Sequence, residues 1–245
     1  MGPDGTIVLV LAVIFLATLI RSAFGFGEAL VAVPLLALLI PVEAAVPLAT
    51  LVSITVAAVI VVQDWHKVHF GSAWRLLFAT LFGIPLGLLL LTAVPERLVK
   101  ALLAVVIVAF SSYCLASRRP IEIKDDRLAW LFGFGAGVLG GAYGMNGPPL
   151  VVYGTLRRWS AEHFRATLQG YFLPASLLGL GGYWLAGLWT PDVTRQYLWS
   201  LPVAGAAIVL GRTVNRRLRG RSFLLVVHVG LIGVGVVLLA QLLWR

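Results

Sequence analysis

Long apolar segments, separated by short polar or charged stretches, follow one another along almost the whole chain. Eight such segments are delimited by charged, proline or glycine residues, and several have the length of about twenty residues that a helix needs to cross a bilayer. Stretches such as Leu98–Phe110 are apolar on every side, which is typical of membrane helices rather than of alternating barrel strands. The pattern predicts an all-α polytopic membrane protein. The segments cover residues 6–40, 43–62, 72–92, 97–115, 128–156, 162–187, 195–211 and 222–244.

Glycine-rich stretches interrupt two of these segments. The first contains Arg21–Glu28 (RSAFGFGE) and the fifth contains Gly140–Pro149 (GGAYGMNGPP). Glycine adds backbone freedom and proline lacks an N–H, so each segment predicts a hairpin of two short helices. A helix of about 12–15 residues spans about 18–22 Å, less than the hydrocarbon core of about 30 Å. The hairpin tips are therefore predicted inside the membrane, buried in protein or lining a water-filled cavity.

The basic residues distinguish this scheme from eight simple crossings. With both hairpins folded back, 14 Lys and Arg residues fall on one side and four on the other, whereas eight crossings divide the same residues 10 against 8. Because basic residues gather on the cytoplasmic side, the hairpins are favoured and both termini are predicted on the non-cytoplasmic side. The larger group is Lys67, Arg75, Arg118, Arg119, Lys124, Arg127, Arg157, Arg158, Arg165, Arg212, Arg216, Arg217, Arg219 and Arg221, the smaller is Arg97, Lys100, Arg195 and Arg245, and Arg21 lies in the first break.

The two halves of the chain match at a constant offset of 119 residues. At this offset Ala23-Phe24-Gly25 aligns with Ala142-Tyr143-Gly144. Each half then holds one hairpin and three full spans, so the second half must run opposite to the first. We expect one membrane domain of two inverted repeats, residues 1–118 and 119–245, an architecture in which secondary transporters bind substrate near the bilayer midplane. Flexible kinks in place of hairpins remain the alternative.

Composition excludes several classes of protein. Hydrophobic residues make up 60% of the chain and charged residues 12%, against about 25% charged in soluble domains, so an ordinary soluble enzyme is excluded. The net charge of +9 comes from basic residues beside apolar segments, which indicates topology in a lipid bilayer and no nucleic-acid partner. Cys114 is the single cysteine, so there is no intrachain disulfide.

Motifs for catalysis or cofactors are missing. His66 and His69 lie near Asp64, but no further ligand set accompanies them, so we predict no metal and no cofactor. There is no phosphate-binding loop for ATP and no H-E-x-x-H motif, paired carboxylates or serine–histidine pair within the apolar segments, so no enzyme is predicted. Gly133, Gly137 and Gly141, at four-residue spacing, predict a face for close helix packing.

The second break has the features of an anion site. Gly144, Asn146 and Gly147 precede Pro148, and a proline can begin a helix because its missing N–H would be unpaired there. The new helix would direct its free N–H groups and positive dipole end into the protein, which favours an anion. Asn146 adds an amide donor, and Tyr143 offers a ring on which an organic group could pack.

The first break predicts a similar tip. Ser22, Gly25 and Gly27 offer a hydroxyl and backbone N–H groups, and Phe24 offers a second ring. Arg21 either contributes a full charge to the site or extends from a helix end to the membrane surface, because an arginine at membrane depth is costly and usually functional.

Two polar residues complete the candidate set. Glu28 is a carboxylate within an apolar segment and is a candidate proton-coupling group, although it could instead cap its helix or pair with Arg21. Gln169 is a candidate substrate ligand in the helix that follows the second hairpin. Arg165, four residues earlier on the same helical face, either joins Gln169 or marks the cytoplasmic boundary.

The two breaks resemble the paired motifs of a known family. Gly25–Pro34 (GFGEALVAVP) and Gly140–Tyr153 (GGAYGMNGPPLVVY) are similar to motifs of the TauE/SafE sulfite exporter family, also called the toluene sulfonate uptake permease family. The likeness extends over essentially the whole chain. It implies a transporter of the bacterial inner membrane for sulfur-containing anions such as sulfite or sulfoacetate, with its transport site around Gly25 and Gly144.

These observations together predict a secondary transporter that moves a small anionic substrate by alternating access, with Glu28 as the candidate for proton coupling. The tip aromatics favour an organosulfonate over sulfite. A passive anion channel and a carrier of a non-sulfur anion remain alternatives, and a homodimer is left open.

Overall fold

The structure is a computed structural model that describes residues 3–24, 27–64, 70–116, 123, 125, 127–159, 161–217 and 221–243. In these ranges every regular element is an α-helix, so the predicted all-α class is confirmed. The helices are α1 (Pro3–Phe24), α2 (Glu28–Leu36), α3 (Val42–Asp64), α4 (Phe70–Ala93), α5 (Glu96–Ala116), α6 (Leu128–Tyr143), α7 (Gly147–Leu156), α8 (Ala161–Leu185), α9 (Pro191–Arg217) and α10 (Arg221–Leu243).

Both interrupted segments contain two helices, as the glycine-rich stretches predict. The second segment gives arms of 16 and 10 residues, α6 and α7, close to the expected lengths. The first is unequal, because α1 has 22 residues and α2 has nine. The expectation of two short arms is therefore wrong for α1, which is about 33 Å long and could cross a hydrocarbon core by itself.

Four of the described helices are long and apolar enough to cross a membrane. They contain the windows Gly5–Ala23, Val42–Val59, Trp74–Ala93 and Glu96–Ala116, in α1, α3, α4 and α5. In the described part of these helices, large apolar side chains such as Phe78, Phe82 and Leu89 are exposed, as expected for residues that face lipid. The chain is a membrane protein.

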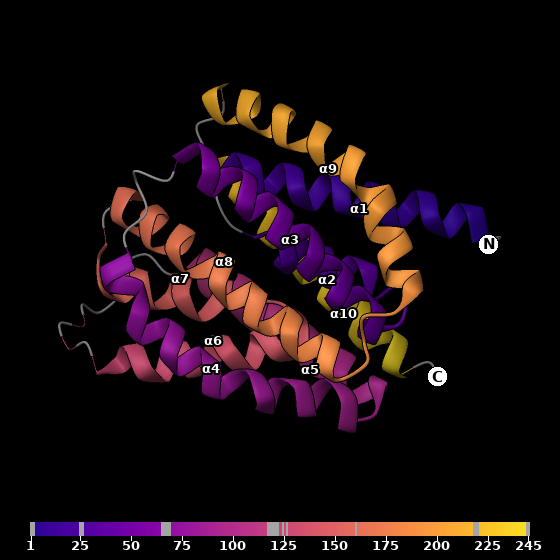
Figure 1. Cartoon of the computed structure of the whole chain (residues 1–245), viewed down its shortest axis with the longest axis horizontal. Helices are drawn as coiled ribbons and strands as arrows, with labels where there is room; N and C mark the ends of the chain where they lie inside the picture. Colours follow the sequence, from indigo (N-terminus) through magenta and orange to yellow (C-terminus); the bar gives the residue numbers. More distant parts are fainter. Residues whose placement is uncertain are drawn as a thin grey trace.

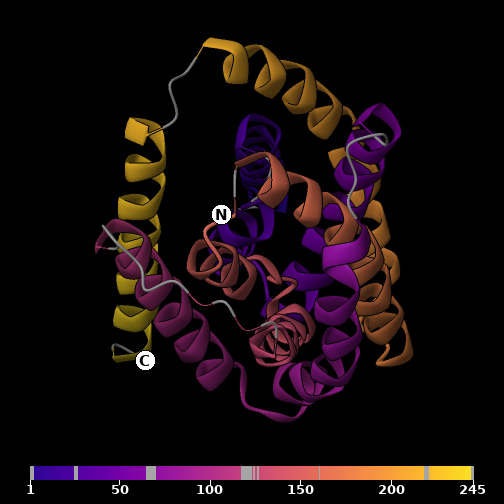
Figure 2. The same cartoon turned by 90° about the vertical axis from the view of Figure 1, so that its left-hand side faces the viewer.

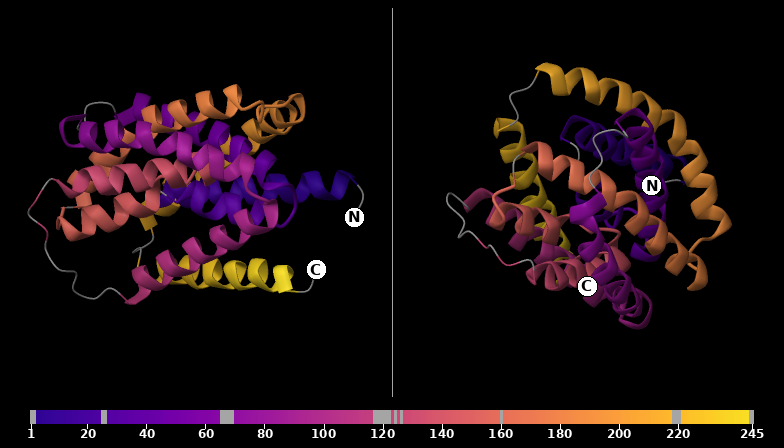
Figure 3. Two further views of the ribbon diagram at one scale, coloured as in Figure 1. Left: turned by 90° about the horizontal axis from the view of Figure 1, so that it is seen from below. Right: turned by 60° about the vertical axis from the view of Figure 1, so that its left-hand side comes forward.

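The main helix pairs join the first half of the chain to the second. α4 packs along α6, α1 along α9, α5 along α10 and α3 along α8. In Figure 2, which looks along many of the helices, the N-terminal helix α1 (indigo) lies inside, with α9 and α10 (orange and yellow) at the periphery. The described ends of α1 and α10 that lead to the two termini lie at one end of the molecule (Figures 1 and 3).

Glycines allow the closest of these pairs to form. A Cβ on Gly137 would lie 2.9 Å from the Cα of Gly83 on α4, and a Cβ on Gly141 would lie 3.1 Å from the Cα of Gly87. Gly133 is equally close to Leu76. The predicted small-residue face is thus confirmed, since α4 and α6 touch backbone to backbone along it.

Candidate functional site

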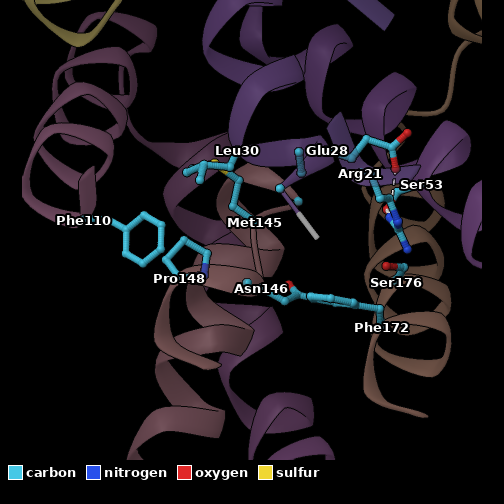
Figure 4. Close-up of a pocket in the computed structure, with 14 residues that line it drawn as sticks. Arg21, Glu28, Leu30, Ser53, Phe110, Met145, Asn146, Pro148, Phe172 and Ser176 are labelled. Carbon is cyan, nitrogen blue, oxygen red and sulfur yellow. Dashed lines mark hydrogen bonds and ion pairs between the residues drawn. The ribbon is translucent and has the colours of Figure 1, made fainter. Parts of the chain in front are cut away.

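The two breaks in the chain meet at one cavity inside the helix bundle. It has a volume of about 30 Å³, and its lining includes the first residues of α2 and α7 together with side chains of α1, α3, α5 and α8. A water molecule needs about 10–15 Å³ by this measure, so the cavity has room for about two waters. Figure 4 shows Arg21, Glu28 and Ser53 on one side of it and Asn146 and Pro148 on the other.

A left-handed glycine begins α2 at the first break. Gly27 has φ 96° and ψ 2°, a conformation that side chains other than glycine rarely adopt, and its carbonyl accepts the first helical hydrogen bond from the N–H of Val31 at 3.1 Å. The N–H groups of Glu28, Ala29 and Leu30 belong to the first turn and have no partner within the helix. All three residues line the cavity, so α2 directs its positive end toward it.

The second break ends α6 and begins α7 within three residues. Gly144 has φ 63° and closes α6 as its N–H donates to the carbonyl of Gly140 at 2.8 Å. Asn146 is the N-cap residue of α7, and Pro148 occupies its first turn. Because prolines have no N–H, the unpaired donors at this helix start are those of Asn146 and Gly147, both of which line the cavity.

A buried ion pair fixes the first break. Nη1 of Arg21 donates to Oε2 of Glu28 at 2.8 Å, and the side chains of the two residues are 5% and 2% exposed. The same nitrogen donates to Oγ of Ser53 on α3, and Thr18 donates to the other carboxylate oxygen at 2.8 Å. Arg21 therefore points inward and does not extend to the membrane surface. Its charge is balanced by Glu28, so the positive potential left at the cavity comes from the two helix ends.

Side chains of α8 and α5 close the cavity. Phe172 and Ser176 lie four residues apart, on one face of α8, and Phe110 comes from α5. The Cζ of Arg21 lies 5.6 Å from the ring centroid of Phe172, within range of a cation–π contact.

Asn146 is oriented by the glycine beneath it. Its side-chain oxygen lies against Gly140, where a Cβ would overlap it, and this oxygen has no hydrogen-bond partner among the described residues. The carbonyl of Gly140 accepts a hydrogen bond from the hydroxyl of Tyr183 on α8, so the backbone there is also fixed. With the oxygen against Gly140, the amide nitrogen is the end of Asn146 that is available to a ligand.

Most of the predicted site residues with described side chains lie around the cavity. Two do not. Ser22 lies under α9, where a Cβ on Gly211 would come within 2.6 Å of the Cβ of Ser22. Tyr143 is buried with its hydroxyl donating to the carbonyl of Val99 at 2.9 Å, so its ring is part of the core. Those lining the cavity are Arg21, Gly27, Glu28, Gly144, Asn146 and Gly147.

Three other predicted residues fall partly or wholly outside the described structure. Gly25 lies between the described ranges, and only the backbone of Phe24 and of Gln169 is described, in α1 and α8. Their roles stay predictions. In contrast, the sequence did not single out Phe172, Ser176, Phe110 or the role of Ser53 as a ligand of Arg21. Gln169 had already pointed to α8, and the four-residue spacing of Phe172 and Ser176 is the signal that could have added these two residues.

A family model identifies the chain. The model described as sulfite exporter TauE/SafE matches residues 10–238, nearly the whole chain. The protein belongs to the TauE/SafE family. Membership assigns it to the membrane transporters of sulfite and related anions, in agreement with the resemblance of the two glycine-rich breaks. No match was found among curated proteins, and none among solved structures.

The donors at the cavity suit an oxyanion better than a metal cation. Backbone N–H groups, the amide of Asn146 and the positive ends of α2 and α7 all favour negative charge. Within the described part of the chain, no group of three or more histidine, cysteine or acidic side chains could hold a metal ion.

Proposed function

We propose that this TauE/SafE protein is a secondary transporter that carries a small sulfur-containing oxyanion, with sulfite as the first candidate, across the bacterial inner membrane. The observation that carries the proposal is the meeting of two helix N-termini, of α2 and α7, at one buried cavity beside Arg21. Each helix end is equivalent to about half a positive charge, so the two ends together supply about one. A buried site with this charge favours an anion.

The size of the cavity favours a compact anion. A volume of about 30 Å³ suits a small inorganic oxyanion better than a sulfonate with an organic chain. The earlier preference for organosulfonates depended in part on Tyr143, whose ring is packed in the core. Sulfite is therefore the better first candidate, with sulfoacetate, isethionate and taurine as the alternatives to test.

The helix pairs support transport by two inverted repeats. At the offset of 119 residues, α1 corresponds to α6 and α4 to α9, so the pairs α4·α6 and α1·α9 exchange with each other. The pairs α3·α8 and α5·α10 each join a helix to its own counterpart. A two-fold relation of this kind gives two equivalent packings, and rocking between them would expose the cavity to one side and then the other. The basic side of the protein is the cytoplasmic one in this proposal.

Glu28 is the proposed proton carrier. Its carboxylate accepts a hydrogen bond from Nη1 of Arg21, and an anion in the cavity would be attracted to the same nitrogen. The carboxylate of Glu28 and the bound anion therefore compete for Arg21. A proton on Glu28 removes that competition, and anion and proton would then move together. In proteoliposomes, a pH gradient is expected to drive uptake of sulfite by the wild type but not by Glu28→Gln. Equal responses of both proteins to the gradient would contradict the role of Glu28 while leaving anion transport in place.

Calorimetric titration of the purified full-length protein in detergent tests the substrate. Sulfite, taurine, sulfoacetate, isethionate and chloride are titrated into wild type, Asn146→Ala and Asn215→Ala. The chain has only these two asparagines, and Asn215 lies in the last turn of α9, so it is the matched control. We expect saturable sulfite binding that weakens about 10-fold or more in Asn146→Ala and is unchanged in Asn215→Ala. Wild-type protein that is folded and binds none of the sulfur anions would refute the assignment.

A channel remains the second candidate because it would use the same helix ends. Proteoliposomes distinguish the two. A carrier coupled to a gradient accumulates labelled sulfite above its electrochemical equilibrium, whereas a channel brings it only to that equilibrium.

A further inference from the structure

Phe172 lies between the two breaks in the wall of the cavity. It projects from α8, lies beneath the guanidinium of Arg21 and extends toward Asn146 at the second break (Figure 4). A Cβ on Gly147 would lie 3.8 Å from its Cζ, so the ring edge faces the first residue of α7. One ring thus lies next to the charged residue of one break and faces the helix start of the other.

The surroundings of Phe172 hold the ring in place. Its side chain is 9% exposed, and its ring meets that of Tyr171 edge to face at 6.0 Å. Tyr171 is itself buried and its hydroxyl pairs with Thr80 on α4. Burial and this contact both disfavour rotation of the ring away from the cavity.

We propose that Phe172 is the residue that sets the size of the anion that the transport site accepts. The inference rests on the proposed function and adds its selectivity. The cavity of about 30 Å³ is small even for a compact oxyanion, and the ring of Phe172 forms the part of its wall against which the organic part of a sulfonate would have to fit. The face of the Phe172 ring also lies next to Arg21. In this inference the volume of the ring determines which anions fit, and the contact between the ring face and Arg21 does not.

The experiment measures preference between anions, which a general loss of affinity does not change. Dissociation constants for sulfite and isethionate are determined by calorimetry on the full-length protein for wild type, Phe172→Ala, Phe172→Val and Phe172→Leu. Each methylene-sized change in a pocket alters selectivity by about 10- to 200-fold. The ratio of the isethionate constant to the sulfite constant is expected to fall at least about 10-fold in Phe172→Ala, less in Phe172→Val and least in Phe172→Leu.

Phe132→Ala is the matched control. Phe132 packs against Tyr153 in the same apolar cluster as Phe172, but it does not line the cavity, so its removal deletes the same atoms without enlarging the site. The ratio of the isethionate to the sulfite dissociation constant in Phe132→Ala is expected to equal that of wild type. Should Phe172→Ala not fold, Phe172→Val gives the same comparison.

Three results would overturn the inference. One is a ratio that stays unchanged in the Phe172 variants, and another is an equal fall in Phe132→Ala. The third is an equal fall in Phe172→Ala and Phe172→Leu, which would assign selectivity to the ring face beside Arg21. In each case sulfite binding by wild type shows that the proposed function stands, whereas a wild type that binds neither anion refutes the function itself.

Discussion

Substituting Gly140 by alanine should displace the side chain of Asn146 from the site without changing residue 146 itself. A Cβ at this position would overlap the side-chain oxygen of Asn146 and lie 2.9 Å from its Cγ, so the amide must turn away. A hydrogen bond from the amide to a charged ligand contributes about 1.5–3 kcal/mol, which corresponds to about 10- to 150-fold in the dissociation constant. Alanine also favours a helix over glycine by about 1 kcal/mol, so the protein should not lose much stability.

Gly135→Ala is the control for this effect, because on the same helix its nearest neighbour is the Cγ of Pro149 at 4.0 Å and the new methyl group has room. Sulfite affinity is measured by calorimetry, and stability by thermal unfolding in detergent. The variants are Gly140→Ala, Gly135→Ala, Asn146→Ala and the double variant that combines Gly140→Ala with Asn146→Ala. Gly140→Ala should bind as weakly as Asn146→Ala, and the double variant no more weakly than either. Tight binding by Gly140→Ala beside weak binding by Asn146→Ala would refute the orientation of the amide.

Three further substitutions test the framework around the site. Gly137→Ala places a methyl group against the backbone carbonyl of Thr80, which cannot yield, so thermal unfolding in detergent should show a loss of about 1–3 kcal/mol that the control glycine variant lacks. Glu28→Gln leaves Arg21 as a buried charge without its counterion, and should lower the unfolding free energy by about 3–5 kcal/mol, a loss that replacing both residues partly restores. Tyr171→Phe removes the hydroxyl that pairs with Thr80 and should cost about 1 kcal/mol in the same assay, with sulfite affinity unchanged.

Helix positions could be predicted well from hydropathy, and the differences have a physical cause. The segment 97–115 became Glu96–Ala116, whereas 195–211 became Pro191–Arg217. The added residues of α9 are polar and charged, and Asp192 and Arg195 form an ion pair in its first turn at 2.8 Å. Hydropathy marks the part of a helix that is in contact with lipid or protein core, so it misses turns that continue into the polar boundary.

The sequence predicted the two helix starts at the cavity, but it did not predict the aromatic residues that line the rest of it. Glycine and proline show where a helix is interrupted, and they located the starts of α2 and α7 at the cavity. Phe172 and Phe110, in contrast, belong to stretches of α8 and α5 that are apolar on nearly every face, and such stretches give no signal for the face that turns inward. For the same reason the sequence could not separate Tyr143, which packs in the core, from an aromatic residue that lines the cavity.

The arrangement of charge explains why the site lies where the halves meet. An arginine inside a membrane protein needs a partner, and Arg21 finds one seven residues later in Glu28 because the break turns the chain back on itself. That pair balances the side-chain charge of the first break and leaves the end of α2, so the end of α7, from the second half, doubles the positive potential at the cavity. Neither half supplies the complete set of donors. A relative movement of the halves therefore changes the affinity of the site and its access together, which is the property that a carrier requires and that a fixed pore does not.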